Sequence, residues 1–393
     1  MIFTAVETLL LAGLALVLGT LIHRLIPWTA RYNLPGSVLG GFVFALLLLG
    51  YRQSGGTVTF ATDLQTPLMI AFFASLGFSA SISRLIAGGK PLMVFFIATV
   101  AILILQDIVG IGVAVGLGQS PLFGVMTSSV SLVGGPGTAL AFAPAFEKAG
   151  MADAGTIGLT AALGGIICAG LFGGPLSTFL IERNNLRSTI QGHVSIRGEE
   201  IEHFASDRLT GLILSHIFLL VIAIVLGFYV SRGIQGMGIT LPPYIGSMIV
   251  AAVLRNLDDK FEVVRMRESW LDALGSSALA IFIAMSMMTL DFAKLKDVGF
   301  PILIALLLQV GVVLVAARYL MFPLLGRTYE AAVLSGGMFG FMMGTVANAM
   351  ANIETIQRRK GPAPNAGLFI SLVGACFIDF VNAAVITVFL NIL

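Results

Sequence analysis

The chain has 393 residues, of which 57% are hydrophobic and 11% are charged. Soluble domains carry roughly 25% charged residues, so this composition excludes a soluble globular protein. The net charge of +2 is too small to indicate a nucleic-acid partner. The two cysteines, Cys168 and Cys376, lie deep in apolar segments, where a packing role is expected rather than a structural disulfide.

Charged residues, glycines and prolines divide the chain into apolar stretches that are long enough to cross a bilayer. The ten expected spans are 4–26, 34–51, 66–83, 90–117, 154–181, 209–231, 241–255, 271–290, 298–322 and 364–392. The first span lacks a basic segment before it, so we interpret it as a retained helix and not as a signal peptide.

Two further apolar stretches, residues 128–146 and 335–345, are rich in glycine and serine. Glycine at this density, with proline in the first stretch, disfavours a continuous helix. Broken backbone inside a bilayer is tolerated only where protein buries it or a wet cavity adjoins it. Either stretch alone is explained more simply by glycine packing between helices. A pair at corresponding positions of two halves instead indicates a transporter's binding site. We expect re-entrant hairpins at about 121–146 and 327–352.

The two halves of the chain resemble each other, with landmarks offset by 202 to 207 residues. The matching landmarks are Asn33 and Thr240, Gln106 and Gln309, and Gly134 and Gly336. This pattern predicts an N-terminal repeat at 1–181 and a C-terminal repeat at 209–393, joined by a polar linker at 182–208.

The placement of basic residues predicts how the hairpins meet the membrane. If both hairpins return to the side from which they enter, 17 of the 22 Lys and Arg residues share one side. If each stretch crosses once, the count becomes 11 against 11. The positive-inside rule therefore predicts ten crossings, both termini outside and the 182–208 linker in the cytoplasm. Because each repeat crosses the membrane five times, an odd number, the two repeats insert with opposite orientations. The expected fold is therefore an all-α polytopic membrane protein with ten transmembrane helices and two re-entrant hairpins in two inverted five-helix repeats.

Two acids are expected deep in spans, where charge is costly and indicates function. Asp379 and Asn382 stand three residues apart, on one helical face, and offer oxygen ligands suited to sodium. The alternative for Asp379 is a structural hydrogen bond to the second hairpin. Asp107 follows Gln106 and has no acidic counterpart in the other repeat. It is either a substrate-ammonium contact or an interhelical hydrogen bond, and the sequence favours neither.

The hairpins offer hydroxyls, an amide and helix ends. Half-helix N-termini suit carboxylates, and freed carbonyls suit sodium. No arginine is expected at mid-membrane, so an anionic substrate would be held largely by helix ends. The expected substrate-binding residues are Ser131, Gly134, Gly135, Gly137, Thr138, Gly336, Gly337, Gly340, Gln106 and Asp107. The expected ion ligands are Asp379, Asn382, Asn348 and Thr345.

Several function classes lack their motifs in this sequence. There is no GxxxxGK[ST] loop, which weighs against an ATP-driven pump. The four histidines have no metal-ligand spacing, and there is no nucleophile–base pair, so an enzyme is not expected. A channel stays open as an alternative, because two oppositely inserted hairpins also suit a pore.

Four stretches, 67–77, 134–138, 336–344 and 374–382, carry a family likeness in this order. With them, the chain resembles the sodium/glutamate symporter family over essentially its full length. The resemblance implies sodium-coupled uptake of glutamate across a bacterial inner membrane, with sodium as the coupling ion and no other cofactor. It also implies a homodimer in which a core domain moves like an elevator against a scaffold.

The chain departs from the family pattern at two places. Pro136 stands where related chains usually carry histidine, and bulky residues lie between Gly337 and Gly344. Both departures bear on substrate identity. The alternative is a sodium- or proton-coupled carrier of another small carboxylate or amino acid.

Overall fold

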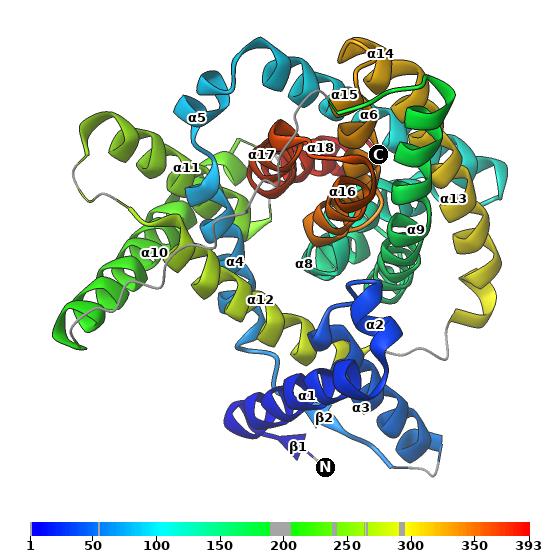
Figure 1. The fold of residues 1–393 in the computed structure, drawn as a ribbon. Coiled ribbons are helices and arrows are strands. Elements are labelled where there is room, and N and C mark those ends of the chain that lie inside the picture. The colour runs from blue at the N-terminus through cyan, green and yellow to red at the C-terminus, as the bar shows by residue number, and fades with distance from the viewer. Residues whose placement is uncertain are drawn as a thin grey trace.

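The computed structural model describes residues 2–53, 56–188, 206–237, 242–262, 264, 266–290 and 295–393. Within these residues the chain is predominantly helical (Figure 1). The expected linker at 182–208 lies mostly outside the described residues. Two short strands, β1 (Ile2–Phe3) and β2 (Thr59–Phe60), form a parallel pair.

The helices follow in chain order. The first half contains α1 (Ala5–Leu25), α2 (Pro27–Arg31), α3 (Gly36–Gln53), α4 (Gln65–Ser79), α5 (Ile82–Ala87), α6 (Gly89–Gly116), α7 (Pro121–Val125), the π-helical turn η1 (Met126–Val130), α8 (Gly135–Lys148) and α9 (Ala154–Arg183). The second half contains α10 (Ser206–Gln235), α11 (Pro243–Phe261), α12 (Glu268–Thr289), α13 (Leu295–Ala316), η3 (Ala317–Met321), α14 (Phe322–Leu324), α15 (Tyr329–Met342), α16 (Val346–Lys360), α17 (Pro364–Leu372), η4 (Val373–Phe377) and α18 (Ile378–Ile392).

Each of the ten apolar stretches expected from the sequence coincides with a helix or a series of helices. Among the described residues, six helices are long and apolar enough to cross a membrane. They are α1, α6, α9, residues Ile213–Gln235 of α10, α12 and the series Val298–Leu324. Their length and composition establish an all-α membrane protein.

The helices pack into two groups. One group, here called the frame, comprises α1 to α5 with α10, α11 and α12. The other, the bundle, comprises α6 to α9 with α13 to α18. Figure 1 shows the frame along the lower and left sides and most of the bundle at the upper right. In the frame, α11 packs against α10 and α4, α3 packs against α1 and α12, and α4 packs against α12.

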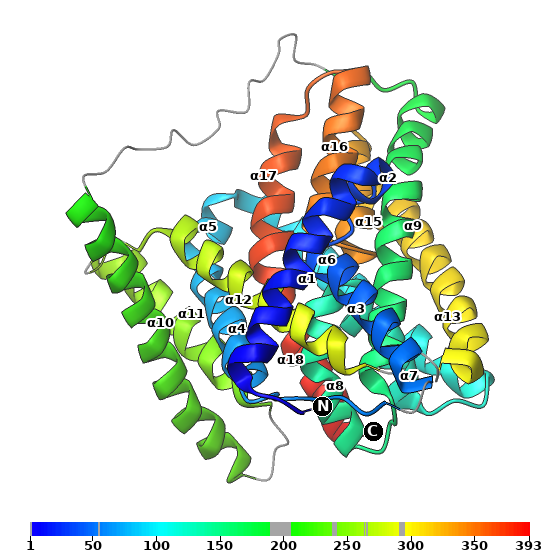
Figure 2. The ribbon, with the colours of Figure 1, turned by 90° about the horizontal axis from the view of Figure 1, so that it is seen from below.

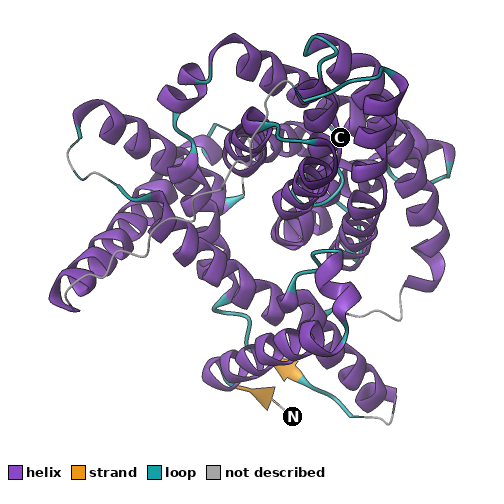
Figure 3. Cartoon of the chain, viewed as in Figure 1, coloured by secondary structure: helices purple, strands orange, loops and turns teal. Residues whose placement is uncertain are grey.

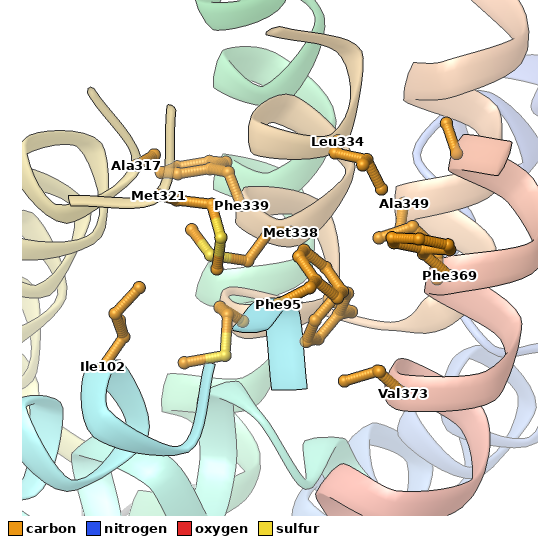
Figure 4. Close-up of a cluster of buried hydrophobic side chains, with 14 of the residues drawn as sticks. Phe95, Ile102, Ala317, Met321, Leu334, Met338, Phe339, Ala349, Phe369 and Val373 are labelled. Atoms are coloured by element: carbon orange, nitrogen blue, oxygen red, sulfur yellow. The ribbon is translucent and has the colours of Figure 1, made fainter. Parts of the chain in front are cut away.

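Close packing of apolar side chains holds the bundle together. Figure 4 shows side chains of α6, η3, α15, α16, α17 and η4 converging on one cluster. Phe95 of α6 lies edge-on to Phe341 of α15, with ring centroids 6.3 Å apart. Lipid tails are as apolar as these side chains, so helix association here depends on interlocking contacts and not on escape from water.

The long axes of many helices run in one general direction, which Figure 2 makes visible. Both ends of the chain lie on the lower side of that view, where α8 also ends. The α16 helix extends to the opposite, upper side. Figure 3 shows that short loops join most helices.

Candidate functional site

The first interruption in the bundle lies between η1 and α8, at residues 131–134. The hydroxyl of Ser120 caps α7, and Pro121 occupies its first turn. Ser128, inside η1, has non-helical dihedrals of φ −113° and ψ −115°. The α8 helix then begins at Gly135, whose φ is +68°. The expected break in this stretch is confirmed.

The second interruption lies between α15 and α16, at residues 343–345. Thr345 caps α16, because its hydroxyl accepts the backbone N–H of Asn348 at 3.3 Å. Gly336, Gly337 and Gly340 lie inside α15. The break expected in the stretch 335–345 is therefore present, but it lies at the end of that stretch and not at these three glycines.

These glycines instead allow helices to approach closely. A Cβ built on Gly336 would meet the Ser177 hydroxyl and would lie 2.5 Å from the Gly173 carbonyl oxygen of α9. A Cβ on Gly340 would lie 2.6 Å from the Cα of Ala349. Small residues serve this role between membrane helices.

The two interruptions face each other. A Cβ built on Gly135 would lie 3.9 Å from the carbonyl oxygen of Gly344. The α9 helix supports the second interruption, because the side-chain amide of Asn348 donates to the Ile166 carbonyl at 3.2 Å. Their helices extend to opposite sides of the bundle, as α8 and α16 show in Figure 2. The bundle thus contains two helix ends that meet away from its outer surface.

Side chains from two distant helices hold a single residue of η1, just before the first interruption. The backbone N–H of Ser129 donates to Asp107 Oδ1 of α6 at 3.0 Å. The carbonyl of Ser129 accepts from Asn382 Nδ2 of α18, also at 3.0 Å. Asp107 and Ser129 are 0% exposed, and Asn382 is 1% exposed. These contacts satisfy backbone groups that the irregular turn would otherwise leave unpaired.

The repeat-related glutamines connect both interruptions. Gln309 Nε2 donates to the Ser128 hydroxyl at 2.7 Å and to the Gln106 carbonyl at 2.8 Å. Gln106 Nε2 donates to the carbonyl of Met342, the last residue of α15, at 3.4 Å. Gln309 was absent from the expected site, although its offset from Gln106 in the repeat was the signal that pointed to it.

Six buried side-chain oxygens around the interruptions have no hydrogen-bond partner in the described part of the chain. They are Gln106 Oε1, Asp107 Oδ2, Ser129 Oγ, Gln309 Oε1, Asn348 Oδ1 and Asn382 Oδ1. Buried polar atoms are nearly always paired in folded proteins, so such oxygens mark places where a cation or a polar ligand can bind.

Four other expected residues lie at the first interruption, and Asp379 lies at the start of α18. Gly134 caps α8, and Gly137 and Thr138 lie in its first turn. The hydroxyl of Ser131 donates back to the Met126 carbonyl and is committed to its own turn. Asp379 is half-buried at the start of α18 and makes no hydrogen bond or ion pair with any described residue. The structural hydrogen bond considered for it does not occur within these residues.

Comparison with known proteins adds to this geometry. The model of the "Sodium/glutamate symporter" family matches residues 1–362. The sodium/glutamate symporter of Haemophilus influenzae is 34% identical over 391 residues, which cover 98% of this chain and 97% of the relative. The sodium/glutamate symporter of Escherichia coli is 34% identical over 386 residues, covering 98% and 96%. The chain therefore belongs to the sodium/glutamate symporter family and is a membrane transporter, not an enzyme.

Proposed function

We propose that this chain couples sodium entry to the uptake of glutamate, or a closely similar small anionic amino acid, across the bacterial cytoplasmic membrane. The observation that carries this proposal is the meeting of two interrupted helices beside the buried carboxyl of Asp107 inside the bundle. Such interruptions supply unpaired backbone groups for both an anion and a cation. The names of the relatives support the same substrate pair.

The proposed topology has ten crossings, two re-entrant hairpins and inverted repeats. Each helix group takes the same elements from both halves: α1, α3 and α4 match α10, α11 and α12 in the frame. In the bundle, α6, the α7–α8 pair and α9 match α13, the α15–α16 pair and the α17–α18 series. The packing of α11 on α4 is the counterpart of α3 on α12. This exchange of partners supports a pseudo-twofold relation between the halves.

The proposed substrate site lies between the starts of α8 and α16. Gly135, Gly137 and Thr138 present the first-turn N–H groups of α8, where a carboxylate is favoured. At the second interruption, residues 343–345 are proposed to contact the substrate in place of Gly336 and Gly337, because the helix breaks at 343–345.

The proposed ion ligands include Asp379, with Thr345 and Asn348 at the start of α16. A carboxylate at membrane depth is costly unless a cation, hydrogen bonds or protonation offsets its charge. Asp379 makes no ion pair with any described residue, which supports a bound cation as its partner.

The proposed motion carries the bundle past the frame, and the frame is proposed to form the interface of a homodimer. The boundary between the groups includes aromatic contacts: Phe142 of α8 lies edge-on to Tyr244 of α11, with centroids 5.2 Å apart. Apolar contacts without fixed hydrogen bonds suit a boundary that slides, since no directional bond has to break.

Competition measurements test the substrate assignment. Purified protein in liposomes would be given labelled glutamate with a sodium gradient or with choline in place of sodium. Unlabelled aspartate, glutamine and citrate would compete in separate samples. The proposal predicts saturable uptake only with sodium, and competition by acidic amino acids. Competition by citrate alone would favour another carboxylate, and linear sodium-independent flux would favour a channel.

A further inference from the structure

We propose that Asp107, Ser129 and Asn382 form a sodium site that assembles on the first interruption before any substrate is bound. The inference deepens the proposed function, on which it rests in taking sodium as the coupling ion. It places Asp107 with the ion and not with the substrate's ammonium group. It also adds the Ser129 hydroxyl, one of the hydroxyls expected in the first hairpin but not among the expected ion ligands.

Ser129 brings the three oxygens together. Asp107 accepts a hydrogen bond from the N–H of Ser129, and Asn382 donates one to the Ser129 carbonyl. Both side chains therefore contact the same residue. Each uses one atom for that bond and leaves one oxygen unpartnered, Asp107 Oδ2 and Asn382 Oδ1. The Ser129 hydroxyl is the third unpartnered oxygen. The three oxygens come from α6, η1 and α18, and all belong to Ser129 or to a side chain bonded to it.

The charge of Asp107 calls for a cation. The carboxyl is fully buried and pairs with no basic side chain in the described part of the chain. An unpaired buried charge costs several kcal/mol even after the surroundings relax. The hydrogen bond from the Ser129 backbone N–H offsets only part of that cost. A bound cation at Oδ2 offsets the remainder.

The ligand chemistry selects a hard monovalent ion. Carboxylate, hydroxyl and amide oxygens suit hard cations and not soft metals. One carboxylate balances a single positive charge, whereas Ca²⁺ takes six to eight oxygens, usually from several carboxylates. Backbone carbonyls freed by an interrupted helix supply further ligands of the type that sodium uses in transporters. The non-helical dihedrals of Ser128 place such an irregularity directly beside Ser129.

The site connects ion binding to the substrate site. Ser129 lies two residues before the interruption at 131–134, and α8 begins immediately after it. Gln309 fixes the neighbouring Ser128 hydroxyl from α13. A cation held by α6, η1 and α18 therefore orders the segment that leads to the N-terminus of α8. Sodium binding should precede substrate binding, because it completes this segment.

The test is a sodium titration without glutamate. Purified protein in detergent would be titrated with sodium chloride at constant ionic strength, with choline as the replacement, while the thermal unfolding midpoint is recorded. The variants are Asp107→Asn, Ser129→Ala and Asn382→Ala. The control, Ser75→Ala, removes an equally buried hydroxyl, which donates to the Phe72 carbonyl within α4. Ser129→Thr restores the hydroxyl.

The site predicts that the half-saturating sodium concentration rises about tenfold or more in the Asp107 and Ser129→Ala variants, since loss of even an outer-shell partner costs a metal site 10- to 100-fold. Ser75→Ala should match the wild-type protein, and Ser129→Thr should recover most of the affinity. Ser129→Ala loses a single atom, so it stays informative if Asp107→Asn does not fold.

Three results would overturn the site. The first is a sodium response that is absent from the wild-type protein or unchanged in all the variants. The second, from a separate glutamate titration in saturating sodium, is a variant set that loses glutamate affinity alone, which would return Asp107 to the substrate's ammonium group. The third, from uptake measured at two pH values, is a loss of pH dependence with sodium affinity intact, which would make Asp107 a proton carrier. A wrong substrate assignment leaves the titration unaffected, because no substrate is present.

Discussion

Tyr244 carries a buried polar atom that is expected to lower the stability of the fold. Its ring stacks on Phe73 with centroids 4.2 Å apart, and its buried hydroxyl has no hydrogen-bond partner among the described residues. Tyr244→Phe keeps the stacking and removes the unpaired group. We expect the free energy of unfolding to stay the same or to rise by up to about 1 kcal/mol, which would be measured as an unchanged or higher thermal unfolding midpoint. A clear loss of stability would show that the hydroxyl has a partner in the working protein.

Asp379→Asn keeps the side-chain size and removes the charge. We expect the variant to need more sodium for half-maximal glutamate uptake, with a smaller change in its apparent affinity for glutamate, because the carboxylate is proposed to hold an ion. Uptake would be measured against sodium concentration at two pH values. If sodium dependence were intact but pH dependence lost, Asp379 would carry a proton. If only yield or stability fell, its role would be structural.

The sequence allowed the two intramembrane acids to be predicted, but not the residues that they contact. Acids are so rare in apolar spans that Asp107 and Asp379 stand out without any structure. Their partners do not, because they depend on contacts between distant segments. Asn382 was expected beside Asp379 from its spacing of three, yet its amide is bonded to Ser129, 253 residues earlier in the chain.

The first interruption requires Gly135, whose φ of +68° is unfavourable for any residue with a Cβ. Gly118, in the turn after α6, has a φ of +71° and open space around it, which makes it a matched control. Gly135→Ala and Gly118→Ala should each lose about 1–2 kcal/mol of stability. Only Gly135→Ala should abolish uptake, since it alone alters the start of α8. Equal uptake by the two variants would show that the turn at Gly135 has no specific role in transport.

Glycine content alone could not distinguish the two glycine-rich stretches. In the first, the positive φ of Gly135 and the dihedrals of Ser128 break the helix. In the second, Gly336 and Gly340 lie inside α15 and admit α9 and α16, and the break follows at the Thr345 cap. Both uses of glycine yield similar composition. The capping threonine was the better signal for the start of α16.

The prediction for the whole molecule is that both termini lie outside and residues 182–208 lie in the cytoplasm. The described termini share one side of the molecule (Figure 2), as an even number of crossings requires. Ser195→Cys would be labelled by an impermeant thiol reagent in intact cells and in inverted vesicles, in a background with Cys168 and Cys376 replaced. We expect labelling only in inverted vesicles. Labelling in intact cells would reverse the orientation.

The sequence predicted the helices better than their grouping. Hydropathy located all ten apolar stretches, because each one is long and nearly uncharged. The repeats at 1–181 and 209–393 are sequence units, whereas the structure assembles the frame and the bundle from parts of both. That exchange depends on contacts such as α3 with α12, which no local pattern specifies.

Accumulation of glutamate against its own gradient shows whether this chain couples glutamate uptake to sodium. Liposomes with purified protein would receive labelled glutamate at several ratios of external to internal sodium, with the membrane potential clamped at zero and choline as the balancing cation. We expect glutamate to accumulate above its external concentration, with an accumulation ratio that rises with the sodium ratio and falls to one when sodium is equal on both sides. An accumulation ratio that stays at one under every sodium gradient, while glutamate still equilibrates, would contradict sodium coupling.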